Sequence, residues 1–67
     1  MKLMVNGEPR DMQEGTTVAR LLEELQLSPE RVVVEVNLTI LKRAEHPAAV
    51  LRDGDRVEIV QFVGGGS

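Results

Sequence analysis

The chain has 67 residues and a net charge of −3, and 42% of its residues are hydrophobic although Phe62 is the sole aromatic side chain. This length fits one small domain, and the acidic balance argues against a nucleic-acid-binding protein, which needs a basic surface and stacking aromatic rings. No apolar run is long enough to span a membrane and no signal-peptide pattern opens the chain, so we expect a cytoplasmic protein that contacts no membrane.

The first residues predict a hairpin. Residues 1–5 alternate between the two faces of a half-buried strand, and Met4 falls on the outward face. The pair Asn6-Gly7 follows, and it favours a two-residue turn because both central positions of such a turn need a positive φ. The returning residues 8–12 are polar and contain a proline, which cannot donate a ladder hydrogen bond. We therefore expect this second strand at an edge of the sheet.

An amphipathic helix is expected next. Thr16 or Thr17 is suited to the N-cap position, and Ser28-Pro29 is expected to end the segment because the residue before proline avoids the α region. The apolar residues between them recur at the spacing of one helical face: Val18, Leu21, Leu22 and Leu25.

The second half of the chain predicts further strands. Residues 32–36 are rich in valine and too few for a helix, although their uniformity hides which side chains face inward. Asn37 is expected to turn the chain into a short strand over 38–41, and 42–49 is irregular or a brief helical turn. An Asp-Gly-Asp turn then leads into the last strand, 56–63.

This order of elements predicts an α+β fold. The first and last strands are the most apolar and suit the centre of a mixed, four- to five-stranded sheet, and the helix can serve as the crossover between them. The layout is that of a β-grasp domain over residues 1–63, followed by a flexible glycine tail over residues 64–67. We expect the protein alone to be a monomer.

The last strand carries an exposed apolar pair. Val57 and Ile59 should face the core because the charged side chains alternate with them, and this places Val60 and Phe62 on the solvent side. If the first strand is the neighbour, outward Met4 joins this group. Such a cluster beside a tail suggests a partner-docking surface, whereas the competing interpretation packs Phe62 against the sheet edge.

Candidate catalytic groups are few. The chain has no cysteine and one histidine, His46, which lies in a polar stretch and is expected to be an exposed surface residue rather than part of a metal site. Ser28 and Ser67 have no basic partner placed by a motif, so neither is expected to be a nucleophile. The glycines at 64–66 precede no helix and so form no phosphate-binding loop. We expect neither an enzyme nor a bound cofactor.

The tail itself suggests a different chemistry. Gly64, Gly65 and Gly66 lack Cβ atoms, so a narrow channel of another protein can close around them. Three extended residues reach roughly 10 Å, enough to carry a terminal carboxylate into a partner's active site. Activated there as an acyl adenylate, the carboxylate would make the protein a substrate and carrier. The letters GGGS also match an engineered linker, so the tail alone has two interpretations.

Four stretches together resemble one family. They are MVNGEP, GTTVARLLEEL, VVVEVN and LRDGDRVEIVQFVGGG, and the last is the most specific. The chain resembles the ThiS family, the ubiquitin-like sulfur carriers of thiamine biosynthesis. In that family a ThiF-type adenylyltransferase uses ATP to adenylate the terminal glycine carboxylate. Sulfur that originates from cysteine converts it to a thiocarboxylate, and thiazole synthase (ThiG) consumes that sulfur.

The resemblance implies roles for residues at the end of this chain. Gly66 is expected to carry the adenylate and then the thiocarboxylate, preceded by Gly65 and Gly64. Members of the family usually end on glycine, so Ser67 is either removed before activation, foreign to the native gene product, or the mark of an inactive or differently employed form. The expected partner-facing residues are Met4, Val60, Phe62 and Val63.

Two alternatives stay open at this point. The chain could carry sulfur for molybdopterin or another sulfur-transfer pathway, although molybdopterin carriers tend to be longer. It could also be a β-grasp interaction module without acyl chemistry. Only the second alternative predicts that removing the last residues leaves partner binding and pathway function intact.

Overall fold

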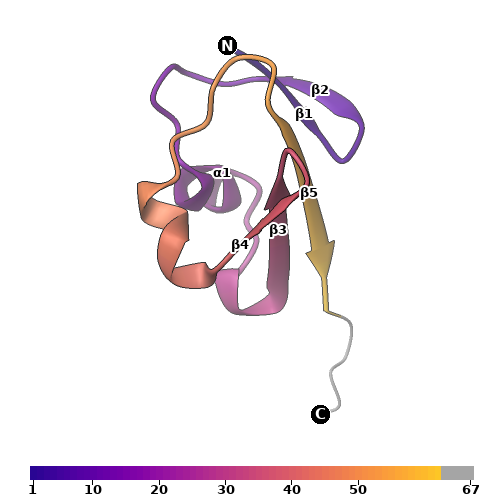
Figure 1. Ribbon diagram of the computed structural model, residues 1–67, viewed down its shortest axis with the longest axis vertical. Helices are drawn as coiled ribbons and strands as arrows, with labels where there is room; N and C mark the ends of the chain where they lie inside the picture. Colours follow the sequence, from indigo (N-terminus) through magenta and orange to yellow (C-terminus); the bar gives the residue numbers. More distant parts are fainter. Residues whose placement is uncertain (63–67) are drawn as a thin grey trace.

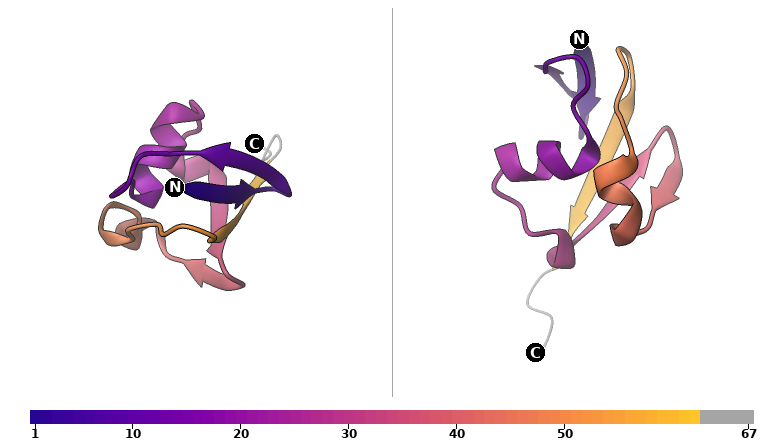
Figure 2. Two further views of the ribbon diagram at one scale, coloured as in Figure 1. Left: turned by 90° about the horizontal axis from the view of Figure 1, so that it is seen from above. Right: turned by 90° about the vertical axis from the view of Figure 1, so that its left-hand side faces the viewer.

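Five strands form one mixed sheet in the order β2-β1-β5-β3-β4 in the computed structural model, which describes residues 1–62. The helix α1 and the 3₁₀ helix η2 lie on the same side of this sheet (Figures 1 and 2). This arrangement confirms the predicted β-grasp layout, while the predicted boundary between domain and tail lies outside the described residues. The elements are β1 (Lys2–Val5), β2 (Glu8–Asp11), α1 (Val18–Glu24), η1 (Pro29–Arg31), β3 (Val32–Val36), β4 (Thr39–Leu41), η2 (Arg43–Ala48) and β5 (Arg56–Gln61).

The amino-terminal hairpin forms as predicted. Asn6 and Gly7 have φ angles of 50° and 81°, which the two-residue turn between antiparallel β1 and β2 requires. All four residues of β2 are exposed, and β2 lies at the edge of the sheet. β1 pairs in parallel with β5, so the chain must cross over between them, and α1 lies in that connection.

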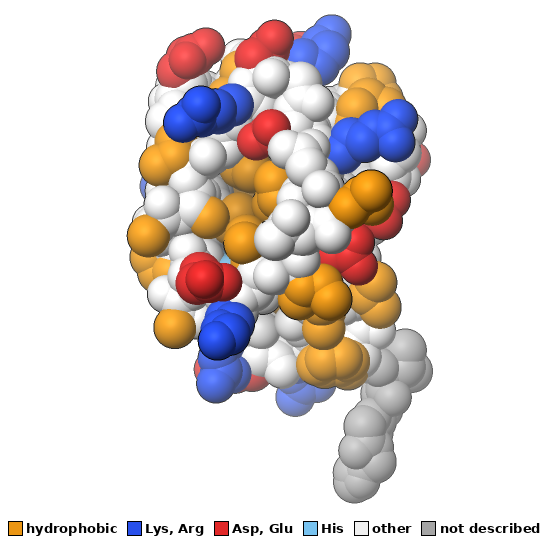
Figure 3. Space-filling view, viewed as in Figure 1, with side chains coloured by type: hydrophobic (Ala, Val, Ile, Leu, Met, Phe, Trp, Pro, Cys, Tyr) orange, Lys and Arg blue, Asp and Glu red, His pale blue; other side chains and the backbone are white. Residues whose placement is uncertain are grey.

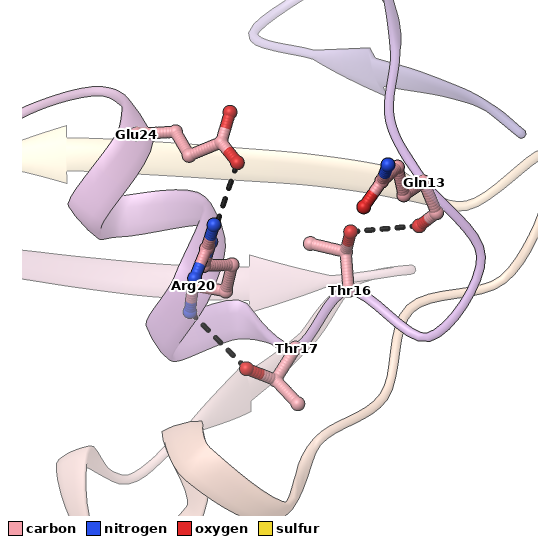
Figure 4. A network of polar contacts seen from close by, with 5 residues as sticks. All are labelled: Gln13, Thr16, Thr17, Arg20 and Glu24. Carbon is pink, nitrogen blue, oxygen red and sulfur yellow. Dashed lines mark hydrogen bonds and ion pairs between the residues drawn. The ribbon is translucent and has the colours of Figure 1, made fainter.

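α1 begins at a threonine cap. The side-chain oxygen of Thr17 accepts a hydrogen bond of 3.1 Å from the backbone N–H of Arg20, whose guanidinium lies 3.3 Å from the carboxylate of Glu24 (Figure 4). The neighbouring Thr16 is buried and donates its hydroxyl to the carbonyl of Gln13 at 2.7 Å. Thr17 is therefore the N-cap, and Thr16 anchors the loop that precedes the helix.

The carboxyl end of α1 differs from the prediction. The helix ends at Glu24 rather than near Ser28-Pro29, because Gln26 adopts a φ of 60°. The N–H of Leu27 donates to the carbonyl of Leu22 at 2.9 Å. The N–H of Gln26 donates to the carbonyl of Glu23 at 3.0 Å. These two bonds form a Schellman motif, which commonly has glycine at the position that glutamine occupies here.

The core lies between the sheet and α1. Val57 and Ile59 of β5 face inward as predicted, and Val32 and Val34 show which face of the valine-rich strand β3 is buried. The absence of other aromatic rings leaves this packing to aliphatic side chains. The buried apolar residues are Leu3, Val5, Val18, Leu21, Leu22, Val32, Val34, Leu51, Val57 and Ile59.

Candidate functional site

The outer face of β5 exposes the two apolar side chains that the sequence predicts there. Val60 and Phe62 are 59% and 56% exposed, whereas Ile59, the residue before Val60, is buried. The backbone N–H of Phe62 donates to the carbonyl of Arg31 at 2.8 Å, so the strand pairing continues up to this residue. This bond holds the backbone of Phe62 beside the sheet, with its exposed side chain on the solvent side.

Two further apolar side chains extend this surface. Val33 of β3 pairs directly with Val60, and Ile40 of β4 pairs with Glu35, the next outward residue of β3. We call Val33, Ile40, Val60 and Phe62 the outer patch. Figure 3 shows hydrophobic side chains gathered over the lower part of β5. The sequence missed Val33 because the uniform valine run hid which side of β3 faces outward, and it missed Ile40 because the short strand β4 has no period that predicts its exposed side.

Two acidic side chains lie beside the outer patch. Glu35 and Glu58 are partners in the register between β3 and β5, so they are neighbours on the same face of the sheet. Like charges opposite one another weaken strand pairing, and neither carboxylate makes an ion pair within residues 1–62. The outer patch therefore has a negative rim on one side, which favours a partner surface with basic side chains.

Met4 lies farther along the same face. It pairs with Arg56, which is four positions before Val60 in β5. Four residues of a strand span roughly 13 Å, so this is the distance along β5 from Arg56 beside Met4 to Val60. Glu58 lies between Arg56 and Val60 on the outward side. The structure therefore places half-buried Met4 on the expected face but does not bring it next to Val60 and Phe62.

Asn6 has a role that the sequence analysis missed. Its side-chain oxygen accepts a hydrogen bond from the N–H of Ile59 at 2.8 Å, and its side-chain nitrogen donates to the carbonyl of Ile59 at 3.2 Å. The amide of this turn residue thus occupies the place of a strand residue beside β5. An Asn-Gly turn indicates backbone conformation only, so no local signal could have revealed this contact.

His46 contradicts the expectation of an exposed surface residue. It is 3% exposed, and neither ring nitrogen has a hydrogen-bond partner within the described part of the chain. Burial, and secondarily the charge of Arg43, lowers the pKa of His46, while the charge of Glu45 partly opposes this effect. The physical reason is the helical turn of η2, which contacts α1 and directs this one side chain inward.

Residues 1–62 contain no cluster of three or more side chains that could hold a metal ion. None of the helices in the same range is long and apolar enough to cross a membrane. The predicted residues Val63, Gly64, Gly65 and Gly66 lie outside the described part of the chain.

Comparison with known proteins points in one direction. The family model described as "ThiS family" matches residues 3–66. A thiazole synthase of Magnetococcus marinus is 44% identical over 66 residues, which cover 98% of this chain but 20% of that relative. The chain thus spans only about a fifth of the length of the thiazole synthases that it matches.

Proteins of similar length match as well. The sulfur carrier protein ThiS of Thermus thermophilus is 42% identical over 62 residues, which cover 92% of this chain and 95% of that protein. A crystal structure of a thiamine biosynthesis protein (ThiS) from Geobacter metallireducens has a TM-score of 0.84 at 40% identity, covering 98% of this chain and 100% of that one.

Proposed function

The chain belongs to the ThiS family, and we propose on this basis that it is a sulfur carrier of thiamine biosynthesis, a protein substrate rather than an enzyme. The single observation that carries the proposal is the extent of the family match, which runs from residue 3 to residue 66 and so includes the glycines as well as the folded domain. The similarity to sulfur carriers over nearly their whole length supports the same assignment.

The reactive group is the carboxylate of Gly66, which is free only in a form of the chain from which Ser67 is absent. Its oxygen attacks the α-phosphorus of ATP, pyrophosphate leaves, and an acyl adenylate forms. Hydrosulfide then attacks the acyl carbon, AMP departs with the carboxyl oxygen bonded to phosphorus, and one proton is released. The product is a thiocarboxylate on Gly66, and no net oxidation or reduction of the carrier takes place. Sulfur that originates from cysteine enters at this second step.

The folded domain serves to deliver this group. Phe62 is the last described residue, and the four residues from it to Gly66 span at most about 14 Å when extended. An enzyme that docks on the outer patch, which includes Val60 and Phe62, therefore has the carboxylate within reach of its active site. Gly64 and Gly65 let a narrow channel of the enzyme close around the chain. Val63 and Met4 add to the surface that the docked enzyme contacts.

Two enzymes act on this carrier. A ThiF-type adenylyltransferase activates the carboxylate, and thiazole synthase (ThiG) takes the sulfur. The second partnership is supported by the thiazole synthase relatives, because a segment of those proteins matches the whole of this chain. Fusion of a carrier with the enzyme that consumes its sulfur raises the effective concentration of the pair.

Activation can be tested by intact mass. A form that ends at Gly66 is incubated with a ThiF-type enzyme, ATP and sulfide, and we expect the mass gain of one oxygen-to-sulfur exchange. The matched control is the full 67-residue chain, in which the carbonyl of Gly66 is in a peptide bond with Ser67 and cannot be adenylated. If the Gly66 form gains neither an adenylate nor sulfur under conditions that load another carrier, the proposed function is wrong.

A further inference from the structure

The backbone of β5 alternates between two neighbours. The carbonyl of Arg56 accepts from the N–H of Asn37 at 2.8 Å, and the N–H of Phe62 donates to the carbonyl of Arg31 at 2.8 Å. Asn37 and Arg31 are the residues directly after and before β3, so the backbone groups of even-numbered β5 residues point toward β3. The carbonyl of Val57 accepts from the N–H of Asn6 at 2.9 Å, so odd-numbered residues bond toward β1. This alternation follows from strand geometry and identifies which groups face the β1 side.

The β1 side of β5 is covered over only part of its length. β1 itself pairs with Arg56 and Val57, and the side chain of Asn6 occupies both backbone groups of Ile59. Figures 1 and 2 show the β1–β2 hairpin beside only the upper part of β5. The next odd residue, Gln61, is exposed, and it lies opposite Val32 at a position of the β3–β5 pairing where the backbone groups point away from β3. Because the pairing of β1 with β5 ends at Val57, the N–H and carbonyl of Gln61 point to the uncovered side of β5.

The other edges of the sheet are protected from pairing. β2 is fully exposed but consists of a proline between charged residues, and β4 has only three residues. Short strands, charges and proline are the usual means by which edges avoid pairing with other chains. The edge at Gln61 carries none of these devices. It is therefore the place in the described sheet best suited to accept an added strand.

We propose that the activating enzyme adds an extended segment of its own to β5 at Gln61. This inference rests on the proposed function, because it concerns the enzyme that binds the tail. Gly66 lies five positions after Gln61, at most about 17 Å of extended chain, so an enzyme that holds Gly66 in its active site also covers this edge. Main-chain hydrogen bonds then supply alignment and affinity, while the outer patch supplies specificity.

Two variants at one position separate the backbone from the side chain. Gln61→Pro removes the N–H, and the domain should tolerate it because this N–H points away from β3 and lies beyond the end of the β1 pairing. We expect Gln61→Pro to weaken binding to the ThiF-type enzyme about tenfold, the effect of losing one hydrogen bond. Gln61→Ala keeps the N–H and should bind like the unchanged chain. Binding of a folded Gln61→Pro variant at full strength would overturn the proposal.

Amide hydrogen exchange provides a second readout that needs no variant. In the free protein the N–H of Gln61 should exchange rapidly, and in the complex with the activating enzyme it should be protected about tenfold or more. Rapid exchange of Gln61 in a saturated complex would contradict strand addition even if Gln61→Pro fails to fold. If the wild-type Gly66 form is adenylated while Gln61 stays unprotected, only this inference fails. If it is not adenylated at all, the proposed function fails.

Discussion

Asn6 contributes to the fold through both its backbone and its side chain. Its positive φ of 50° makes the hairpin turn, and its side-chain amide bonds both backbone groups of Ile59. Aspartate also tolerates this turn conformation, but it lacks the N–H that the carbonyl of Ile59 accepts. A residue that local pattern explains completely thus has a second role that only the tertiary structure reveals.

His46 is the residue whose environment differs most from the sequence prediction. Its ring is buried and makes no hydrogen bond within residues 1–62, and its pKa is lowered by burial and by Arg43. The unfolded chain, with an ordinary histidine pKa near 6.5, binds the proton more readily than the folded protein. Its contribution to stability is therefore fully present above that pH and is lost as the pH falls toward the lower folded value.

Replacement of His46 tests this linkage. We expect the free energy of unfolding to fall between pH 7.5 and pH 5.5 by more in the unchanged protein than in His46→Leu, with the difference at most about 1.4 kcal/mol per pH unit. Urea unfolding at each pH measures both proteins. The two proteins differ only at residue 46, so the difference between them reports on His46. Equal slopes would show that this ring does not titrate differently in the folded and unfolded chains.

Among the elements, β5 concentrates the features that matter for function. It is the central strand, it buries Val57 and Ile59 against α1, and it presents Val60 and Phe62 on the opposite face. One strand therefore joins the core, the outer patch and the tail. Changes on its two faces should affect different properties, because one face is packed and the other is solvent-exposed.

A matched pair of alanine variants tests this division. Ile59→Ala should lower the free energy of unfolding by about 2–5 kcal/mol, as truncation of a buried aliphatic side chain does. Phe62→Ala should change it by less than about 1 kcal/mol, yet weaken binding to the ThiF-type enzyme tenfold or more, as loss of an exposed aromatic anchor does. Denaturant unfolding and a binding titration measure the two effects. If Phe62→Ala unfolds as readily as Ile59→Ala, the ring belongs to the core.

The elements differ in how well the sequence predicts them. The hairpin, the apolar face of α1 and the two faces of β5 follow from periodicity and turn chemistry, which are local. The end of α1 was misplaced because glutamine rather than glycine takes the left-handed position at residue 26. The inward turn of His46 and the exposure of Ile40 depend on how η2 and β4 pack, and neither segment has a period that predicts it.

For the whole molecule, we propose that the folded domain is a carrier that holds a reactive end and presents it to enzymes. The family match over residues 3–66 and the exposed outer patch support this account, while the described residues contain no cluster suited to metal binding. The site itself could be predicted from sequence only through the glycine ending and its resemblance to a family. Composition and periodicity alone give a β-grasp domain with an exposed apolar patch and no chemistry.

Transfer of labelled sulfur tests the central claim most directly. The form that ends at Gly66 is loaded with isotopically labelled sulfur, freed of excess label, and added to thiazole synthase with its other substrates. We predict that the label leaves the carrier and is recovered in the thiazole ring in proportion to the carrier supplied. A thiazole product without label, formed while the carrier keeps its sulfur, would contradict the account.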